Sequence, residues 1–391
     1  MIAAAQPLAL LATPVLLSGG TEAQTLTLAS VLLAAGWNVT VCCYHESDPA
    51  TVAAFEAAGA RVMLLGLSRG LGLFGVARAL RKAFRALRPD VVHVQYLAPG
   101  FTAVLAARAA RVRTVFATVH QPGGTYGFRE RGLLRFSSHL CTAFFAVSKA
   151  VENSWFGDAA LFDSDSPLGG RRHFTIYNAV DTAGIVAAGR TVDPVASRLT
   201  LGIAADAPVL GFIGRVRREK GLDVLIRALP AAVVVFPELR LLVVGDGPEA
   251  GDLRELARRE GVLDRIVWRG MCDTNETRRL LTVMNIAVVP SRFEGFGLAA
   301  AEAQAAGVPV VATDVDGLRE VIAGGQTGLL VPPEDPRALA ATLVRLLGAP
   351  EMAREMGRRG RERVGELFSI ERFARDTLIF YAAARTSRPA R

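Results

Sequence analysis

Cysteine is rare in this sequence, and its placement excludes the scaffolds that depend on it. The four cysteines are Cys42, Cys43, Cys141 and Cys272. None forms a Cys-x-x-Cys pair or lies near a histidine at metal-site spacing, so the sequence predicts neither a disulfide framework nor a zinc site. No Asp-x-Asp pair directly follows a predicted strand either, and we expect no metal site. This use of cysteine is typical of the reducing cytoplasm.

The sequence also lacks a long hydrophobic run. No apolar stretch approaches the ~20 residues needed to span a bilayer. The segment Met1–Leu17 is apolar, but it has no basic residues at its start, and Pro7 and Pro14 interrupt it. We therefore expect a first β-strand here and not a signal peptide. Hydrophobic residues still make up 51% of the chain, as suits an α/β enzyme with buried parallel strands.

Acidic residues are scarce in one long stretch of the first half. From Arg61 to Arg129 there are eleven Arg and Lys residues and a single acid, Asp90. The stretch is either a solvated basic face or a surface that attracts an anionic partner. Few aromatic residues lie among these basic residues to stack on bases, so lipid is favoured over nucleic acid as that partner.

The most basic part of this stretch predicts an amphipathic helix at residues 73–88. Its apolar stripe consists of Leu73, Val76, Leu80, Phe84 and Leu87. Its basic residues are Arg78, Arg81, Lys82, Arg85 and Arg88. Such a helix can lie on an anionic bilayer, or its stripe can pack on a sheet while the basic residues face water. We expect both together: a packed stripe, and a basic face that gives weak, salt-sensitive membrane binding.

Apolar runs alternate with helical patterns twice along the chain. In the first half, strands are predicted at residues 8–13, 38–44, 61–65, 90–95, 114–120, 143–148 and 175–177. After a linker within 181–207, further strands are predicted at residues 209–213, 239–244, 265–268, 286–289 and 308–312. Strands separated by helices indicate parallel βαβ units, with ligands at the carboxyl ends of the strands.

This pattern predicts an α/β fold of two Rossmann-like domains, each a doubly wound parallel sheet, facing each other across a cleft. We expect an N-terminal domain at residues 1–190 and a C-terminal domain at residues 200–367. A C-terminal helix at residues 370–391 is expected to pack back on the first domain.

The segment at residues 290–311 carries two glutamates whose spacing suits a nucleotide ligand. Glu294 lies in the loop after a predicted strand, and Glu302 follows eight residues later inside the next helix. Gly295 and Gly297 bracket the start of this helix, where bare N–H groups and the helix dipole favour a phosphate or sugar hydroxyls. Glu302 can reach a vicinal diol such as a ribose. Taken alone, the segment could equally be a glycine-rich helix start with two solvated carboxylates.

Two basic residues follow the predicted strand at 209–213. Directly after Gly214, Arg215 offers a planar fork for two phosphate oxygens, and Lys220 offers a mobile point charge. Most basic residues of an arginine-rich chain are ordinary surface cations. The spacing Gly-Arg-x4-Lys-Gly straight after a buried strand indicates a phosphate site instead, in which the two side chains take the place of a metal ion.

Together these segments resemble glycosyltransferase family 4, in the order in which that family has them. Residues 294–302 are similar to its Glu-x7-Glu motif, and residues 214–221 to its phosphate-binding pair. Looser matches are the loop Gly19-Gly20, the turn 244–248 with Gly245, the Tyr-Asn-Ala-Val-Asp stretch at 177–181 and the late strand at 327–331. The resemblance covers nearly the whole chain and is strongest at residues 208–347. Departures from the family pattern are Ala179 and Asp316 in place of glycines and Gln304 in place of a frequent methionine.

The resemblance implies a retaining glycosyltransferase of the GT-B fold. Such an enzyme moves a hexosyl unit from a nucleoside-diphosphate sugar to a glycan or lipid-linked acceptor, as in polysaccharide biosynthesis, and the acceptor attacks the face that the diphosphate leaves. The implied catalytic residues are His120, Arg215, Lys220 and Glu294. The implied donor-binding residues are Gly19, Gly20, Gly214, Arg215, Lys220, Gly245, Gly295, Phe296, Gly297, Leu298 and Glu302. The donor is a substrate, and no separate cofactor or metal is implied.

Three other functions compete with this interpretation. An epimerase or a phosphorylase on the same scaffold would need acid/base carboxylates at the sugar or a lysine that holds pyridoxal phosphate. A dehydrogenase is disfavoured because residues 211–214 are only a fragment of the Gly-x-Gly-x-x-Gly fingerprint. A non-catalytic partner subunit is disfavoured by the intact set of Arg215, Lys220, Glu294 and Glu302. The sequence specifies neither the base and sugar of the donor nor the acceptor.

Overall fold

The structure, a computed structural model, describes residues 6–95, 101–164 and 171–386. It divides the chain into two compact units. Unit 1 comprises residues 1–179 and 371–391, and unit 2 comprises residues 180–370. The end of the expected C-terminal helix, residues 387–391, lies outside the described residues. No helix in the described part of the chain is long and apolar enough to cross a bilayer.

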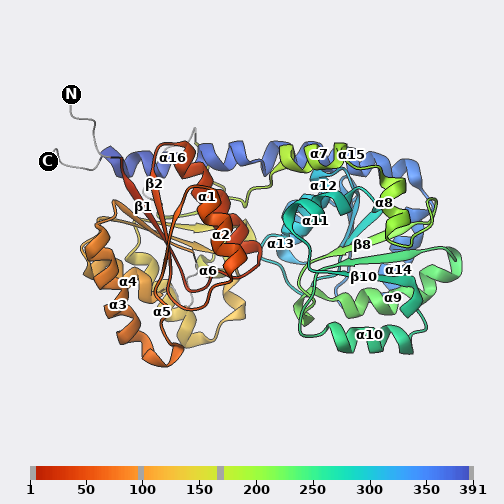
Figure 1. The fold of residues 1–391 in the computed structure, drawn as a ribbon, viewed down its shortest axis with the longest axis horizontal. Coiled ribbons are helices and arrows are strands. Elements are labelled where there is room, and N and C mark those ends of the chain that lie inside the picture. Colours follow the sequence, from red (N-terminus) through yellow and green to blue (C-terminus); the bar gives the residue numbers. More distant parts are fainter. Residues whose placement is uncertain (1–5, 96–100, 165–170, 387–391) are drawn as a thin grey trace. The chain divides into compact units, whose positions relative to one another are not determined.

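Unit 1 contains a parallel sheet of seven strands in the order β3-β2-β1-β4-β5-β6-β7 (Figure 1). The strands are β1 (Leu8–Thr13), β2 (Asn38–Cys43), β3 (Arg61–Leu64), β4 (Val91–Val94), β5 (Thr114–Val119), β6 (Ala143–Ala146) and β7 (His173–Thr175). The helices are α1 (Gly20–Ala34), α2 (Pro49–Ala57), α3 (Gly72–Leu87), α4 (Phe101–Ala109), α5 (Phe128–His139), α6 (Lys149–Phe156) and α16 (Ile370–Thr386).

One face of this sheet is covered by α1, α2 and α16. Alternate residues of the strands point into a shared core with Leu28 of α1, Phe55 of α2 and Phe380 of α16. His93 of β4 is buried within this core, and its Nδ1 and Nε2 lie 2.8 Å from Tyr381 Oη and 2.7 Å from Thr118 Oγ1. The C-terminal helix is therefore an integral part of unit 1, although it comes from the far end of the chain.

The basic amphipathic helix forms as α3, and its apolar stripe is partly buried and partly exposed. Val76, Leu80 and Phe84 are buried in the unit. Leu73, which belongs to the same stripe, is exposed, and so is its neighbour Phe74. The central part of the stripe thus packs inside the unit, while the first turn of the helix presents apolar side chains to solvent.

Unit 2 contains a parallel sheet of six strands in the order β10-β9-β8-β11-β12-β13. The strands are β8 (Val209–Ile213), β9 (Arg240–Val244), β10 (Ile266–Gly270), β11 (Ile286–Val289), β12 (Val310–Thr313) and β13 (Gly328–Val331). The helices are α7 (Thr182–Arg190), α8 (Pro194–Thr200), α9 (Leu222–Val235), α10 (Ala250–Arg259), α11 (Thr274–Leu281), α12 (Leu298–Ala305), α13 (Asp316–Val321), α14 (Pro336–Leu347) and α15 (Pro350–Leu367).

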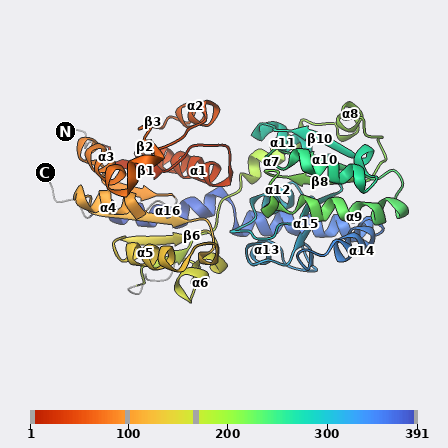
Figure 2. The ribbon, with the colours of Figure 1, turned by 90° about the horizontal axis from the view of Figure 1, so that it is seen from below.

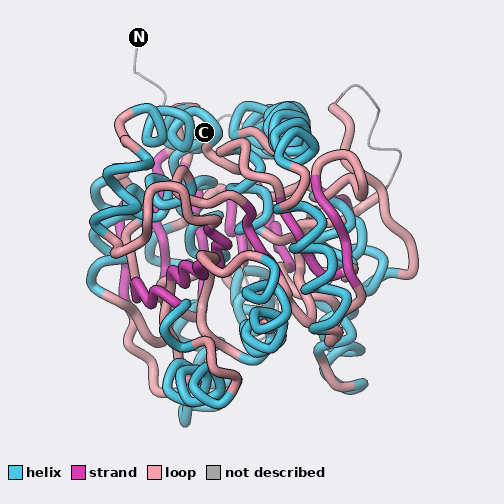
Figure 3. Tube along the Cα trace, turned by 90° about the vertical axis from the view of Figure 1, so that its right-hand side faces the viewer, coloured by secondary structure: helices cyan, strands magenta, loops and turns pink. Residues whose placement is uncertain are grey.

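In both units the strands lie inside and the helices outside (Figure 3). The inner strands are buried because they are short, largely apolar runs between two helical layers, whereas the edge strands β3 and β10 are partly exposed. The expected linker within 181–207 is mostly helical instead, because Asp181 and Asp193 cap α7 and α8 with their side chains. Both helices belong to unit 2. The expected fold of two parallel α/β sheets is confirmed.

Candidate active site

The loop between β8 and α9 carries the two predicted phosphate-binding residues. Gly214 directly follows β8, Arg215 comes next with an exposed side chain, and a short 3-10 turn at Arg218–Lys220 leads to Gly221. Gly221 has a φ of 67°, and a Cβ there would lie 1.9 Å from Pro290 O. Only glycine fits, so the β8–α9 loop packs directly against the chain that leaves β11.

The loop between β11 and α12 brings Glu294 to Lys220. Lys220 Nζ lies 2.6 Å from Glu294 Oε1, although the two residues are 74 positions apart. The Ser291 hydroxyl donates to the same carboxylate oxygen at 2.9 Å. Both side chains of the ion pair are partly buried, so their charges are screened less than on an open surface. The structure thus places a predicted phosphate-binding cation in contact with the first glutamate of the predicted Glu-x7-Glu motif.

Arg292 connects these two loops, and no sequence motif indicated this role. Its guanidinium forms two hydrogen bonds with Asp223 of α9, at 2.8 and 2.9 Å, and its backbone N–H donates to Glu219 O at 2.9 Å. Burial alone would raise the pKa of Asp223, but hydrogen bonds from Arg292 and Arg227 outweigh it and hold that pKa below its usual value. The hydrogen bond to Asp223 in turn raises the pKa of Arg292. This ion pair fixes the spacing of the loops that carry Lys220 and Glu294.

The start of α12 has the open helix end that the sequence predicts. Gly297 precedes the helix with a φ of 101°, and no side chain caps the first turn. Gly295, Phe296 and Leu298 flank it, and Phe296 is buried against Phe368, with ring centroids 5.1 Å apart. The N–H groups of this turn are therefore not engaged by a side-chain cap and can bind an anion or hydroxyls.

Glu302 lies one turn further along α12 and has an unusual carboxyl group. Its side chain keeps some accessible surface, but the protein surrounds the carboxyl closely, and this burial raises its pKa to about 7, with the positive charge of Arg278 acting in the opposite direction. Arg278 of α11 is held by Asp181, with 2.8 Å between Nη2 and Oδ2. Asp181 belongs to the Tyr-Asn-Ala-Val-Asp stretch, so this motif is linked to the carboxyl group of Glu302 through Arg278.

Gly245 lies in the turn after β9, where main chains approach closely. A Cβ at this position would lie 2.0 Å from Gly214 O, and its φ is 133°. Its N–H donates to Gly270 O at 2.8 Å. The need for glycine here follows from main-chain packing beside the Arg215 loop, and a direct donor contact of Gly245 stays a prediction.

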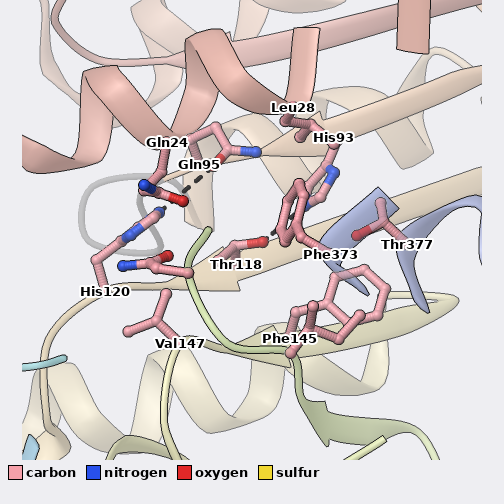
Figure 4. Close-up of a pocket in the computed structure, with 12 residues that line it drawn as sticks. Gln24, Leu28, His93, Gln95, Thr118, His120, Phe145, Val147, Phe373 and Thr377 are labelled. Atoms are coloured by element: carbon pink, nitrogen blue, oxygen red, sulfur yellow. Dashed lines mark hydrogen bonds between the residues drawn. The ribbon is translucent and has the colours of Figure 1, made fainter. Parts of the chain in front are cut away.

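In unit 1, His120 lies just after β5 and lines a small pocket (Figure 4). Its Nε2 lies 3.4 Å from Gln95 Oε1. Burial lowers the pKa of His120 to about 4, so its imidazole is neutral at pH 7. Thr377 of α16 lines the same pocket, and within the described part of the chain Thr377 Oγ1 and Gln95 Nε2 are buried without a hydrogen-bond partner. The pocket thus offers neutral polar groups suited to hydroxyls.

Gly19 and Gly20 lie at the start of α1, also in unit 1. Gly19 has extended backbone, and a Cβ there would lie 2.7 Å from Glu22 Oε2, so a side chain would displace this buried carboxylate. Gly20 is the exposed first residue of the helix. Nearby, the side-chain amide of Gln24 exchanges two hydrogen bonds with the backbone of Ala179, at 2.7 and 2.8 Å.

Known families match both units of the chain. The family described as "Glycosyltransferase Family 4" matches residues 18–183, and the one described as "Glycosyl transferases group 1" matches residues 207–349. The chain belongs to glycosyltransferase family 4. The resemblance stated from the sequence is thereby confirmed.

Individual relatives agree with this membership. A glycogen synthase of Mycobacterium tuberculosis is 29% identical over 398 residues, which is 95% of this chain and 93% of the relative. A D-inositol 3-phosphate glycosyltransferase of Segniliparus rotundus is 36% identical over 224 residues, and this match spans 54% of this chain and 50% of the relative. The chain therefore covers only about half the length of the second relative.

Solved structures show the same GT-B fold. Sucrose-phosphate synthase from Thermosynechococcus elongatus superposes with a TM-score of 0.76 at 25% identity and covers 98% of this chain and 100% of that chain. Anabaena Alr3699/HepE in complex with UDP and glucose superposes with a TM-score of 0.79 at 19% identity, covering 97% and 99% of the two chains.

Within this family 4 member, the structure brings some predicted residues together and leaves others apart. Lys220 and Glu294 are in contact, and Gly214, Gly245 and Gly221 form the packed base of their loops. His120, Gly19 and Gly20 belong to the other unit. Ser291 and Arg292 escaped the sequence analysis although they lie inside the segment that it singled out. Asp223 and Arg278 gave no sequence signal, because their role depends on partners that only folding brings near.

Proposed function

We propose that the chain is a retaining glycosyltransferase that moves a hexosyl unit from a nucleoside-diphosphate sugar to a glycan or a lipid-linked acceptor. The observation that carries this proposal is the contact between Lys220 and Glu294 across two loops of unit 2. In the proposal Lys220 binds a phosphate and Glu294 binds sugar hydroxyls, so their contact supports a reaction at the bond between phosphate and sugar.

Each residue then has a role that follows from its surroundings. Arg215, exposed and in the same loop as Lys220, binds the diphosphate together with Lys220 and neutralises the charge that grows as the phosphate leaves. The open first turn of α12 and Glu294 hold the sugar side of the donor. Glu302 accepts hydrogen bonds from the ribose diol. Neutral His120 offers a hydrogen bond to a sugar hydroxyl without adding charge.

Retention of configuration follows in the proposal from the way the charges are arranged. Glu294 is neutralised by Lys220 and bonded by Ser291, which suits it to hydrogen bonding and not to nucleophilic attack on the anomeric carbon. The acceptor hydroxyl instead approaches the face that the diphosphate leaves. A bond forms from the acceptor oxygen to the anomeric carbon, the bond to the phosphate oxygen breaks, and the acceptor proton passes to the departing phosphate oxygen.

A donor panel tests this function. The purified chain is incubated with uridine, guanosine and adenosine diphosphate sugars, and the products are separated and examined by NMR. We expect one donor class to give free nucleoside diphosphate and, with an acceptor, a glycoside of unchanged anomeric configuration. An isomerised donor would indicate an epimerase, and glycosidic cleavage by inorganic phosphate would indicate a phosphorylase. Donor binding without any turnover would indicate a non-catalytic subunit.

We expect donor hydrolysis and transfer to survive an excess of EDTA. Arg215 and Lys220 supply the positive charge at the leaving diphosphate, so chelation should change the rate by less than about twofold. The measurement is release of nucleoside diphosphate with and without EDTA. Complete loss of activity that Mg²⁺ or Mn²⁺ restores would contradict the expectation.

The proposal also covers where the enzyme works. We place it in the cytoplasm, where its donor would be a soluble metabolite and its cysteines, all free in the structure, would stay reduced. The basic helix α3 supports a peripheral contact with an anionic membrane, which would suit a lipid-linked acceptor.

A further inference from the structure

Exposed apolar side chains of unit 1 are concentrated on two segments. Among the described residues of the unit, eight large hydrophobic side chains are exposed, and six of them lie at residues 71–74 and 128–136. Phe74 and Phe128 are 94% and 92% exposed, almost as much as in an unfolded chain. The other four are Leu71, Leu73, Leu133 and Phe136. Several almost fully exposed large apolar side chains are unusual on a protein that contacts only water.

These two segments belong to one layer of helices. α3, α4 and α5 lie side by side, and α4 contacts both of its neighbours (Figure 2). Each of the three helices precedes a parallel strand, so each begins at the carboxyl edge of the sheet. Phe74 in the first turn of α3 and Phe128 at the first position of α5 therefore lie at the same edge. His120, which follows β5, lies at that edge too.

Unpaired positive charge surrounds the exposed apolar side chains. Arg78, Lys82 and Arg85 of α3 are exposed and form no salt bridge within the described part of the chain, and α3 contains no acidic residue. On α5, Arg129 is exposed beside Phe128. The single acid of α5, Glu130, accepts a hydrogen bond from the backbone of Gly127 at 3.1 Å. We call the exposed side chains of residues 71–85 and 128–136 the α3–α5 surface.

We propose that the α3–α5 surface docks on an anionic lipid bilayer, with Phe74, Phe128 and Phe136 inserted among the lipid headgroups. The combination fits this partner because aromatic side chains gain from leaving water at the interface, while arginine and lysine attract anionic lipids. The docking surface includes α5, which the sequence did not reveal, and it differs from the stripe of α3, whose centre is buried. It deepens the proposed function, on which its purpose rests: docking at this edge presents a lipid-linked acceptor on the side of unit 1 where His120 lies.

Sedimentation with vesicles tests the docking surface. The full chain is mixed with vesicles of phosphatidylcholine alone or with 30% phosphatidylglycerol, in about 50 mM and 500 mM NaCl. We expect binding to the anionic vesicles at low salt only. The triple variant Arg78→Glu, Lys82→Glu and Arg85→Glu should weaken this binding on the order of 100-fold or more. The double variant Phe74→Ser and Phe128→Ser should weaken it at least about tenfold.

Matched control variants come from unit 2. Arg259→Glu, Arg337→Glu and Arg345→Glu together change the net charge equally, and Val234→Ser removes a side chain that is also highly exposed. We expect both controls to bind vesicles like the unchanged protein. Equal binding by all proteins, no binding by any, or loss of binding in the controls as well would overturn the proposal. The proposal would also be overturned if the protein bound no vesicles and instead formed a dimer that the double variant Phe74→Ser and Phe128→Ser abolished.

The outcome can be separated from the fate of the proposed function. Donor hydrolysis in vesicle-free buffer tests the glycosyltransferase and uses none of the residues changed here. Lost vesicle binding with normal donor hydrolysis confirms the docking surface. Vesicle binding of the expected kind in a protein that hydrolyses no donor would leave the docking surface standing and refute the enzyme.

Discussion

Replacing Arg215 or Lys220 with alanine should lower turnover by a factor of about 10²–10³ while leaving the fold intact. In the proposed function both side chains neutralise the diphosphate as it leaves, and this charge is greatest in the transition state, so the loss should fall on kcat more than on KM. Arg215 is the cleaner test, because it is exposed and forms no salt bridge with any described residue. Lys220→Ala also removes the partner of Glu294.

Arg217 provides the matched control for this experiment. It lies in the same loop as Arg215, is likewise exposed, and carries the same charge. We expect Arg217→Ala to keep turnover within about threefold of the unchanged enzyme, since a surface cation of this kind has only a weak long-range effect. Thermal unfolding of all three variants shows whether the fold is kept. Unchanged turnover in both Arg215→Ala and Lys220→Ala would place the diphosphate elsewhere.

The features of the candidate donor site that the sequence predicted are those that depend on a local pattern of residues. Buried parallel strands are short apolar runs, so β8, β9 and β11 were recognisable within a residue or two. The spacing of Glu294 and Glu302 follows from a loop that enters a helix, and the structure has α12 at Leu298–Ala305, close to the expected Gly297–Ala306. What the sequence predicted well is therefore the order of elements and the residues at their ends.

The parts that escaped prediction depend on contacts between distant segments. Arg292 and Asp223 are 69 residues apart, and nothing in either neighbourhood distinguishes this pair from other charges of an arginine-rich chain. The two helices within residues 181–207 were not predicted, because this segment carries no strong apolar periodicity, although Asp181 and Asp193 cap them. Phe74 lies off the apolar stripe predicted for residues 73–88, but helical periodicity alone could not show that no neighbouring element covers its side chain.

One departure from the family pattern now has a physical explanation. Gln304 stands where a methionine is frequent, and its side-chain Nε2 donates to Thr327 Oγ1 at 3.0 Å and to Thr327 O at 3.2 Å inside the core. The amide thus fixes α12 to the turn before β13, where a methionine would only fill space. Asp316, the second departure, is exposed and forms an ion pair with Arg319 at 3.1 Å. Nothing in the structure connects Asp316 with a choice of sugar.

Glu302→Gln should weaken donor binding and, at the same time, stabilise the protein above neutral pH. The two effects have one cause, the burial that raises the pKa of Glu302 from 4.5 to about 7. A carboxyl group with a raised pKa in the folded state favours folding most below pH 4.5, and this contribution is lost as the pH rises to about 7. The loss is about 3 kcal/mol in free energy of unfolding. Glutamine stays neutral at every pH, so the Glu302→Gln variant should not lose this free energy of unfolding as the pH rises.

Donor binding should change in the opposite direction. In the proposed function ionised Glu302 accepts charge-assisted hydrogen bonds from the ribose diol, so a neutral amide should lose about 1.5–3 kcal/mol of binding free energy. The ratio of the two affinities should be largest above pH 7, where Glu302 is ionised, and should approach one at pH 5. Because both proteins bind the same ligand, the titration of the donor's own phosphates does not affect the ratio of their affinities.

Urea denaturation and calorimetric titration with the nucleoside diphosphate, both between pH 5 and pH 8.5, measure the two effects. Glu238→Gln is the matched control, because it makes the same chemical change on the open surface of unit 2 and should alter neither quantity by more than about 0.5 kcal/mol. We expect Glu302→Gln to gain stability over the unchanged protein as the pH rises from 5 to 8, and to lose donor affinity over the same range. A variant that is no more stable at pH 8 than at pH 5, relative to the unchanged protein, would show that Glu302 is not a buried acid. A variant that is stabilised but binds the donor normally would show that the Glu302 carboxyl is buried for a reason other than binding the ribose.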